Sequence, residues 1–235
     1  MTVYGMTLPA ATVAALQRAL DELRTQTPYV YPWAGLEGGI RLVGYGSLLN
    51  AASAARTLAP AGPRRAVLAF GARRLFDSEM SAAALQRYGA GPDSRGGAAL
   101  NVRVTGAIGD AVNGILFDIP AEEIEPLRQR EIGYDLAPVI CFPWERLVGQ
   151  TFLSAEERQT GMSAPPSPFV AHILTRPAHP AAEASRNGPL LPHRAYYLLC
   201  REGAASVSDS FLRFFLASTF LADGLTPVAE WEREA

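Results

Sequence analysis

The sequence contains no lysine, and all 21 of its basic residues are arginines. Without lysine the chain cannot form a lysine Schiff base, attach pyridoxal phosphate or supply the lysine of a phosphate-binding loop. Cysteine is also scarce: Cys141 and Cys200 lie far apart and match neither a redox pair nor a zinc-binding motif. These absences favour a protein of a reducing compartment.

Histidine and long apolar runs are scarce too. His172, His179 and His193 lack the i,i+4 spacing of helical metal ligands and have no carboxylate cluster beside them, so we expect no bound metal. The richest apolar run, residues 211–222, is interrupted by an arginine and is too short to span a bilayer. Residues 1–15 lack the basic start and apolar core of a signal peptide. We therefore expect a soluble, cytoplasmic protein.

The overall composition indicates a folded protein with a small partner. The 235 residues, 49% hydrophobic and 19% charged, suit a single compact unit with a substantial core. The net charge of -2 provides no broad field to attract nucleic acid or an anionic membrane. We expect a small-molecule ligand, and the oligomeric state stays open.

The N-terminal region differs in pattern from the rest. Apolar residues at helical spacing over 13–23 predict an amphipathic helix. Residues 27–35 contain two prolines and a glycine, which end the helix, and three aromatic residues that favour packing over water. We predict two regions: a helix and aromatic strap within 1–38, packed on a domain of residues 39–235.

Short apolar runs broken by glycine fill the middle of the chain. They predict strands over 40–45, 66–76, 98–104, 112–119 and 134–142. The predicted helices are 51–58, 121–130, 195–201 and 209–221, the last with a broad apolar face. Residues 89–97 read as a long loop, 160–168 have no assignable structure, and Phe169 begins a strand or a helix. This order predicts an α+β fold with a small, mostly antiparallel sheet or barrel and helices packed around it.

A glycine turn follows the first central strand. Its residues are Gly44, Tyr45, Gly46, Ser47 and Leu48. It starts like a dinucleotide-binding loop, but leucine replaces the third glycine and residues 63–70 lack the acid that would bind a ribose. Glycines let the backbone approach a ligand closely, and free amides where a helix starts attract an anion such as a carboxylate. The plain alternative is a strand-to-helix turn capped by Ser47 or Asn50.

A single carboxylate, Glu131, stands out beyond the predicted helix 121–130. It lies between Arg130 and Gly133, where a helix ends and a strand begins. Its plain alternative is a solvated charge paired with an arginine, which would contribute at most about 1 kcal/mol. From the residues alone, both interpretations of this glutamate remain open.

Five segments, taken in order, resemble the gamma-glutamylcyclotransferase superfamily over residues 40–142. They are VGYGSLL at 43–49, RRLFD at 73–77, ALNV at 99–102, VNGILF at 112–117 and LRQREIGY at 127–134. The resemblance implies the gamma-glutamylcyclotransferase-like fold and a cofactor-free enzyme that releases 5-oxoproline and an amine from a gamma-glutamyl compound. It also implies that the Gly44–Leu48 backbone binds the gamma-glutamyl group and that Glu131 is the general base and acid.

Two parts of the chain depart from that family pattern. Residues 1–38 match no part of it, and the tyrosine that follows a proline-rich stretch in some members is replaced by Phe169 and Val170, which leaves one pocket wall open. Two alternatives also remain. One is a small-molecule binding protein without turnover, and the other is a related enzyme that removes a gamma-glutamyl group from a larger biosynthetic amine.

Overall fold

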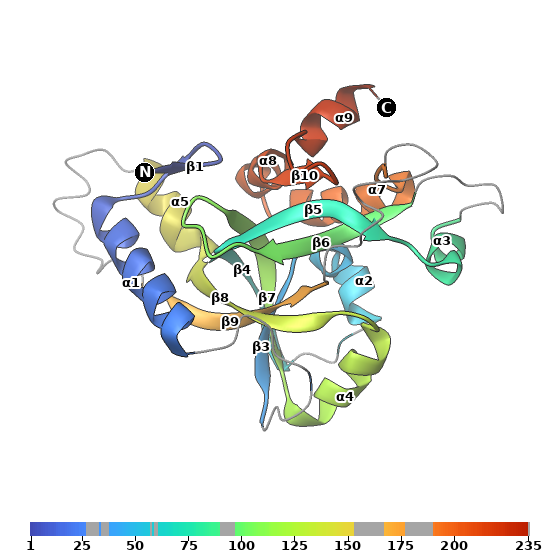
Figure 1. The fold of residues 1–235 in the computed structure, drawn as a ribbon, viewed down its shortest axis with the longest axis horizontal. Coiled ribbons are helices and arrows are strands. Elements are labelled where there is room, and N and C mark those ends of the chain that lie inside the picture. The colour runs from blue at the N-terminus through green and yellow to red at the C-terminus, as the bar shows by residue number, and fades with distance from the viewer. Residues whose placement is uncertain are drawn as a thin grey trace.

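A five-stranded barrel forms the centre of the protein (Figure 1). The computed structural model describes residues 1–26, 33, 38–56, 58, 61–89, 97–152, 167–176 and 190–234. Around the barrel the strands follow the order β3 (Ile40–Gly44), β7 (Ala111–Ile119), β4 (Ala61–Phe70), β8 (Asp135–Pro143) and β9 (Phe169–Thr175). Neighbours are antiparallel except β3 and β9, which are parallel. The predicted α+β fold with a mostly antiparallel barrel is confirmed, and Phe169 begins a strand.

A second sheet lies beside the barrel, in the order β10 (Thr219–Leu221), β5 (Ala72–Glu79) and β6 (Ala98–Val104). The prediction of one strand over 66–76 is wrong, because the chain turns at Gly71 between β4 and β5. Gly71 has φ +80°, a conformation that favours glycine, and its carbonyl accepts hydrogen bonds from the amides of Thr105 and Gly106 at 2.8 and 2.9 Å.

The helices cover the outside of these two sheets. They are α1 (Ala10–Gln26), α2 (Ala51–Ala55), α3 (Ala82–Arg87), α4 (Ala121–Arg130), α5 (Trp144–Phe152), α7 (Arg194–Ala205), α8 (Asp209–Ala217) and α9 (Val228–Glu234). A 3-10 turn, η1 (Ser47–Leu49), precedes α2, and a hairpin of β1 (Thr2–Val3) and β2 (Met6–Thr7) precedes α1. The predicted helix 209–221 is too long, because its last three residues form β10 and pair with β5.

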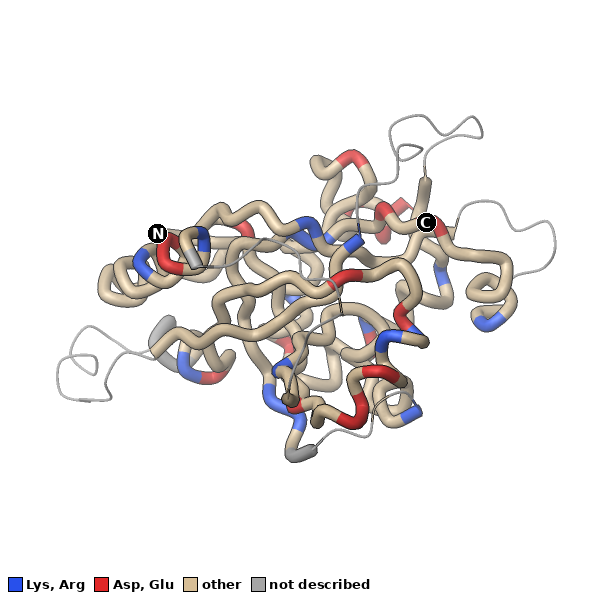
Figure 2. Tube along the Cα trace, turned by 60° about the horizontal axis from the view of Figure 1, so that its bottom comes forward, with Lys and Arg blue, Asp and Glu red and all other residues tan. Residues whose placement is uncertain are grey.

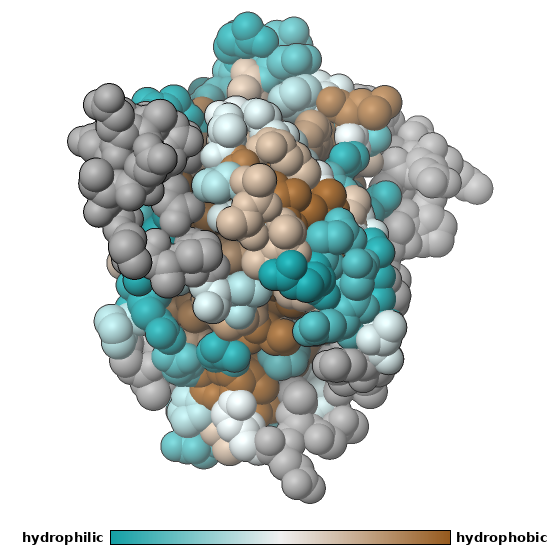
Figure 3. Space-filling view, turned by 90° about the vertical axis from the view of Figure 1, so that its left-hand side faces the viewer, coloured by the Kyte–Doolittle hydropathy of each residue, from teal (hydrophilic) through white to brown (hydrophobic). Residues whose placement is uncertain are grey.

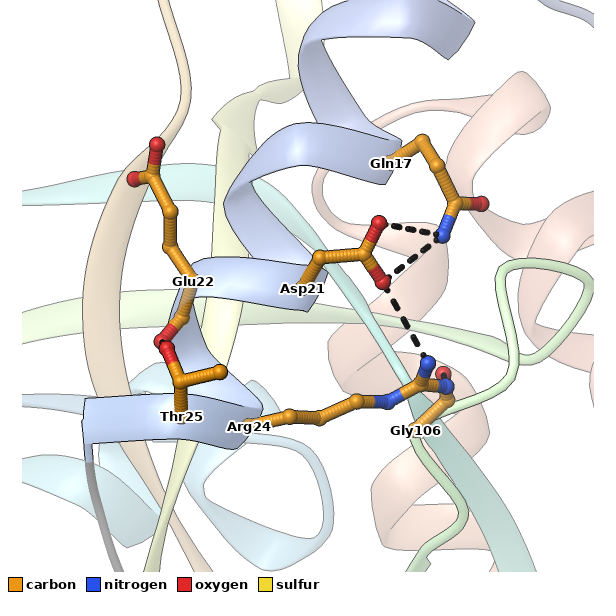
Figure 4. Close-up of polar contacts among 6 residues, drawn as sticks. All are labelled: Gln17, Asp21, Glu22, Arg24, Thr25 and Gly106. Atoms are coloured by element: carbon orange, nitrogen blue, oxygen red, sulfur yellow. Dashed lines mark hydrogen bonds and ion pairs between the residues drawn. The ribbon is translucent and has the colours of Figure 1, made fainter.

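Helix α1 confirms the predicted amphipathic helix, with Leu16 and Leu20 buried. At its end Arg24 donates a 2.6 Å hydrogen bond to the carbonyl of Gly106, and Asp21 accepts hydrogen bonds from Gln17 and Arg24 (Figure 4). Figure 3 shows the molecule from the side on which α1 lies in Figure 1, and apolar residues reach the surface there between polar ones. The division of the chain at residue 38 stays a prediction.

Some predicted segments fall outside the described residues. They are the strap 27–35 apart from Trp33, the loop 89–97 apart from its two end glycines, and 160–168 apart from its last two residues. The Trp33 indole donates a 2.6 Å hydrogen bond to the carbonyl of Tyr134. No helix in the described ranges has the length and hydropathy to cross a bilayer. Acidic and basic residues are interspersed along the described parts of the chain (Figure 2).

One arginine lies in the core and joins the two sheets to the C-terminal helices. Arg74 is fully buried, and its guanidinium donates to six oxygens: Thr219 Oγ1 (2.7 Å), Asn113 Oδ1 (2.9 Å), Asn113 O (3.0 Å), Ser218 Oγ (3.0 Å), Tyr45 O (3.3 Å) and Phe215 O (3.3 Å). Burial lowers its pKa. Arg74 belongs to the RRLFD segment, but only the structure shows that it hydrogen-bonds the carbonyl of Tyr45, the second residue of the glycine turn.

Candidate active site

The glycine turn connects β3 to η1 and requires small residues at two positions. A Cβ at Gly44 would lie 2.6 Å from the Leu48 Cβ, and a Cβ at Gly46 would lie 2.6 Å from the Tyr196 hydroxyl. Asn50, not Ser47, caps α2, because its side chain accepts a 3.0 Å hydrogen bond from the amide of Ser53. The two glycines therefore let packed side chains touch the backbone of the turn directly.

The turn also presents backbone donors. The amides of Ser47 and Leu48 are the first of η1, where N–H groups have no acceptor inside the helix. Gly46 has no side chain to cap them, so in the part of the chain that the structure describes they receive no side-chain cap. These amides can donate to a ligand oxygen.

Glu131 ends helix α4. Its amide donates a 2.9 Å hydrogen bond to the Leu127 carbonyl, and the chain then leaves the helix through Gly133 at φ +80°. The carboxylate is 18% exposed and lies 3.6 Å from the Arg130 guanidinium, which is longer than a hydrogen bond. Burial raises the pKa of Glu131, while Arg130 and two further arginines oppose that shift. The glutamate is therefore neither a fully solvated charge nor one half of a tight ion pair.

The structure brings the turn and Glu131 together. A small hollow of about 50 Å³ is bordered by every residue from Gly44 to Leu48 and by Glu131, Tyr134 and Tyr196. A larger cavity of about 720 Å³ adjoins it and shares Ser47, Glu131, Tyr134 and Tyr196. The predicted site residues thus face one connected space, although their separation in the sequence gives no hint of it.

Buried tyrosines form the walls of the hollow. Burial raises the pKa of Tyr45, Tyr134 and Tyr196, so these phenols stay protonated at neutral pH and can donate hydrogen bonds. Neither Phe169 nor Val170 borders the two spaces. The wall that the sequence left open is formed instead by tyrosines from other elements, and Tyr196 in particular belongs to none of the motifs.

Arg176, directly after β9, links the loop that carries Glu131 to strand β5. Its guanidinium donates to the carbonyls of Ile132 (2.5 Å) and Gly133 (3.2 Å) and to the Ser78 hydroxyl (3.0 Å). The same group lies 4.3 Å from the centroid of the Tyr134 ring, a cation–π contact. Sequence reasoning missed Arg176, because an arginine after a strand carries no signal until the fold shows what surrounds it.

The described residues include no group of three or more histidine, cysteine, aspartate or glutamate side chains that could hold a metal ion. His172 lies on β9 and His193 precedes α7, whereas His179 falls outside the described residues. Cys141 and Cys200 are both buried as free thiols, and burial raises the pKa of Cys200 to about 12. Such a thiol is a poor nucleophile at neutral pH.

Comparison with known proteins found no matching family model and no matching curated protein. Solved structures do match. A gamma-glutamyl cyclotransferase aligns at TM-score 0.49 and 12% identity over 75% of this chain and 86% of that chain. An uncharacterized protein from Homo sapiens aligns at TM-score 0.49 and 12% identity over 76% and 87%. A gamma-glutamyl cyclotransferase specific to glutathione from yeast aligns at TM-score 0.41 and 15% identity over 77% and 96%.

These similarities are weak, with TM-scores of 0.41–0.49. At identities of 12–15% they say nothing about the reaction or the residues that perform it. The chemistry is therefore argued from the site itself.

Proposed function

We propose that this protein is a gamma-glutamylcyclotransferase-like enzyme that releases 5-oxoproline and an amine from a gamma-glutamyl compound. One observation carries the proposal: the Glu131 carboxylate and the Gly44–Leu48 turn border the same hollow. A proton acceptor and a set of backbone donors on one small space suit a substrate that carries both an amine and a carbonyl.

In the proposed reaction the substrate attacks itself. Its α-ammonium gives a proton to Glu131, and the neutral amine then forms a bond to the γ-carbonyl carbon, which closes a five-membered ring. The carbonyl oxygen becomes negatively charged, and the amides of Ser47 and Leu48 are donors of the kind that stabilise such an oxyanion.

The ring intermediate collapses when the bond between the γ-carbonyl carbon and the amide nitrogen breaks. The protonated Glu131 delivers its proton to the departing nitrogen. The regenerated carboxylate then accepts the second proton from the ring nitrogen and passes it to the released amine. Both protons lost by the attacking nitrogen therefore end on the released amine, which leaves as an ammonium ion. No water is consumed, and one carboxyl group performs both transfers.

The electrostatics of the site suit this role. Burial raises the pKa of Glu131, which makes the carboxylate a better base and leaves its protonated form a competent acid. A positioned proton carrier of this kind contributes about 10²–10⁴-fold to the rate. Folding the substrate so that its amine faces its own carbonyl adds the benefit of an intramolecular reaction.

The size of the larger cavity favours one variant of this function. Its volume of about 720 Å³ lies in the upper part of the ~300–1,000 Å³ range of ligand pockets and exceeds what a dipeptide needs. The second candidate function is therefore removal of a gamma-glutamyl group from a larger amine. A binding protein without turnover is the remaining alternative, and the partly buried Glu131 argues against it because a pure binder could lose that charge.

One experiment separates these functions. The purified protein is incubated with a gamma-glutamyl amino acid, glutathione, a small gamma-glutamyl alkylamide and a gamma-glutamyl derivative of a bulky amine, and 5-oxoproline is measured. We expect 5-oxoproline from at least one of them, with the bulky derivative best if the second candidate holds. Binding of these compounds without any 5-oxoproline would contradict the enzymatic proposal.

A further inference from the structure

Strand β5 places a second carboxylate, Asp77, on the wall of the larger cavity. The pairing of β5 with β6 shifts register between Leu75 and Ser78, which marks a bulge or irregularity beside Asp77. Such irregularities re-aim side chains and often occur next to active sites. Although it borders the cavity, the Asp77 side chain itself is fully buried.

The two carboxylate oxygens of Asp77 are in different situations. Oδ2 accepts a 2.8 Å hydrogen bond from Nε of the Arg103 guanidinium, and Nη2 of the same group lies 2.8 Å from Oδ2 in an ion pair. Oδ1 is buried and has no hydrogen-bond partner among the described residues. A buried carboxylate oxygen without a donor is costly, so its persistence calls for an explanation such as a ligand that supplies the donor.

Asp77 lies on the same side of the site as Glu131. Both residues line the larger cavity, as does Tyr134. The Arg176 guanidinium, which bonds to Ser78 at one end and to the Ile132 carbonyl at the other, holds the end of β5 against the loop of Glu131. A ligand in the larger cavity therefore has both residues on its walls.

We propose that Asp77 Oδ1 is a substrate-binding atom that accepts a hydrogen bond from the α-ammonium of the gamma-glutamyl group. This inference rests on the proposed function. An ammonium has three N–H bonds, of which one proton goes to Glu131 and another is held by Asp77, and the second contact restricts the rotation of the amine before the attack. The α-ammonium is also the one cation that every gamma-glutamyl substrate carries.

The test uses two unreactive analogues. In both a methylene group replaces the γ-carbonyl and an ether oxygen replaces the amide nitrogen, and only one of them retains the α-amino group. Dissociation constants are measured by calorimetry for the parent protein and for Asp77→Asn. We expect the parent to bind the amine-bearing analogue at least tenfold more tightly. In Asp77→Asn this preference should fall to about twofold or less, with binding of the other analogue unchanged within twofold.

Asp110→Asn is the matched control. Asp110 is also buried and paired with an arginine, Arg73 at 2.8 Å, but it borders neither of the two spaces. The parent preference should persist in this variant. If Asp77→Asn keeps that preference, or loses affinity for both analogues equally, the assignment of Asp77 is wrong. If Asp77→Asn does not fold, Arg103→Met provides the test. This substitution frees Asp77 Oδ2 and should raise the preference for the amine-bearing analogue at least threefold. An unchanged preference overturns the assignment.

The proposed function and this inference can fail separately. Release of 5-oxoproline by the parent, together with an intact preference in Asp77→Asn, overturns the Asp77 assignment alone. If the parent releases no 5-oxoproline from any substrate but prefers the amine-bearing analogue, and Asp77→Asn loses this preference, the enzymatic function is overturned and an amine-binding site is supported.

Discussion

The buried guanidinium of Arg74 gives the strongest prediction about what holds the site together. It is the donor shared by the turn carbonyl of Tyr45, by Asn113 on β7 and by the end of helix α8 at Phe215. Replacement by methionine keeps much of the volume and removes every donor. Asn113 Oδ1 then has no donor among the described residues, because Arg74 provides the hydrogen bond it accepts.

The magnitude follows from two opposing terms. Each lost hydrogen bond from a charged donor costs about 1.5–3 kcal/mol, and an acceptor left buried without a partner costs about 1–3 kcal/mol. Removing the buried charge returns part of this, since burying one ion costs several kcal/mol. We expect Arg74→Met to lower the free energy of unfolding by about 3–5 kcal/mol, a large part of the ~5–15 kcal/mol of a typical domain.

Urea unfolding of the parent, Arg74→Met and Arg74→Lys measures this loss. Lysine keeps the charge and three donors, so Arg74→Lys should be intermediate, with a loss of about 1–3 kcal/mol. If Arg74→Met unfolds within 0.5 kcal/mol of the parent, the cost of burying the charge cancels its hydrogen bonds, and the reasoning about this network is refuted.

Two further predictions concern the hollow. Gly46→Ala should raise KM at least tenfold, because its Cβ would lie 2.6 Å from the hydroxyl of the buried Tyr196, so that the turn or the tyrosine must shift. Gly109→Ala, where a Cβ meets nothing within 4 Å, should leave steady-state kinetics unchanged. Equal kinetics in the two variants would contradict the placement of the turn. The acid limb of kcat/KM should have its midpoint above the ordinary glutamate pKa of about 4.3, because burial raises the pKa of Glu131 and the base must be ionised to act. A pH–rate profile with its midpoint at or below that value would count against Glu131 as the base.

The general fold could be predicted from the sequence because its pattern is local. The period of apolar residues locates α1, and the buried face of α8 follows from the spacing of Phe211, Phe214 and Phe215. The errors came from signals that depend on partners. Residues 219–221 continue the apolar pattern of α8, and only pairing with β5 makes them a strand. Residues 66–76 read as one strand because apolar residues lie on both sides of the turn at Gly71.

Some residues of the candidate site could be found from the sequence, and others only from the structure. The Gly44–Leu48 turn and Glu131 could be found because each belongs to a short motif that stands out in the sequence. Arg74 and Asp77 lie in the RRLFD segment, but no role could be assigned to them or to Arg176 from the sequence, because their roles depend on burial and on contacts between strands that are distant in the sequence. An unpartnered carboxylate oxygen is visible only once the neighbours of both oxygens are known.

The catalytic role of Glu131 is tested most directly by the rate of 5-oxoproline release from Glu131→Gln at saturating substrate. Glu125→Gln is the matched control, since Glu125 lies on the same helix but is exposed and paired with Arg128. Glu131→Gln should lose about 10²–10⁴-fold in kcat, while the control keeps the parent rate. Glu131→Gln should also melt no lower than the parent at pH 7, because burial raises the pKa of Glu131. At a pH above the ordinary glutamate pKa the ionised Glu131 carboxylate lowers the stability of the parent, and this penalty disappears as the pH falls below that value. A kcat within tenfold of the parent would contradict the assignment of Glu131 as the proton carrier.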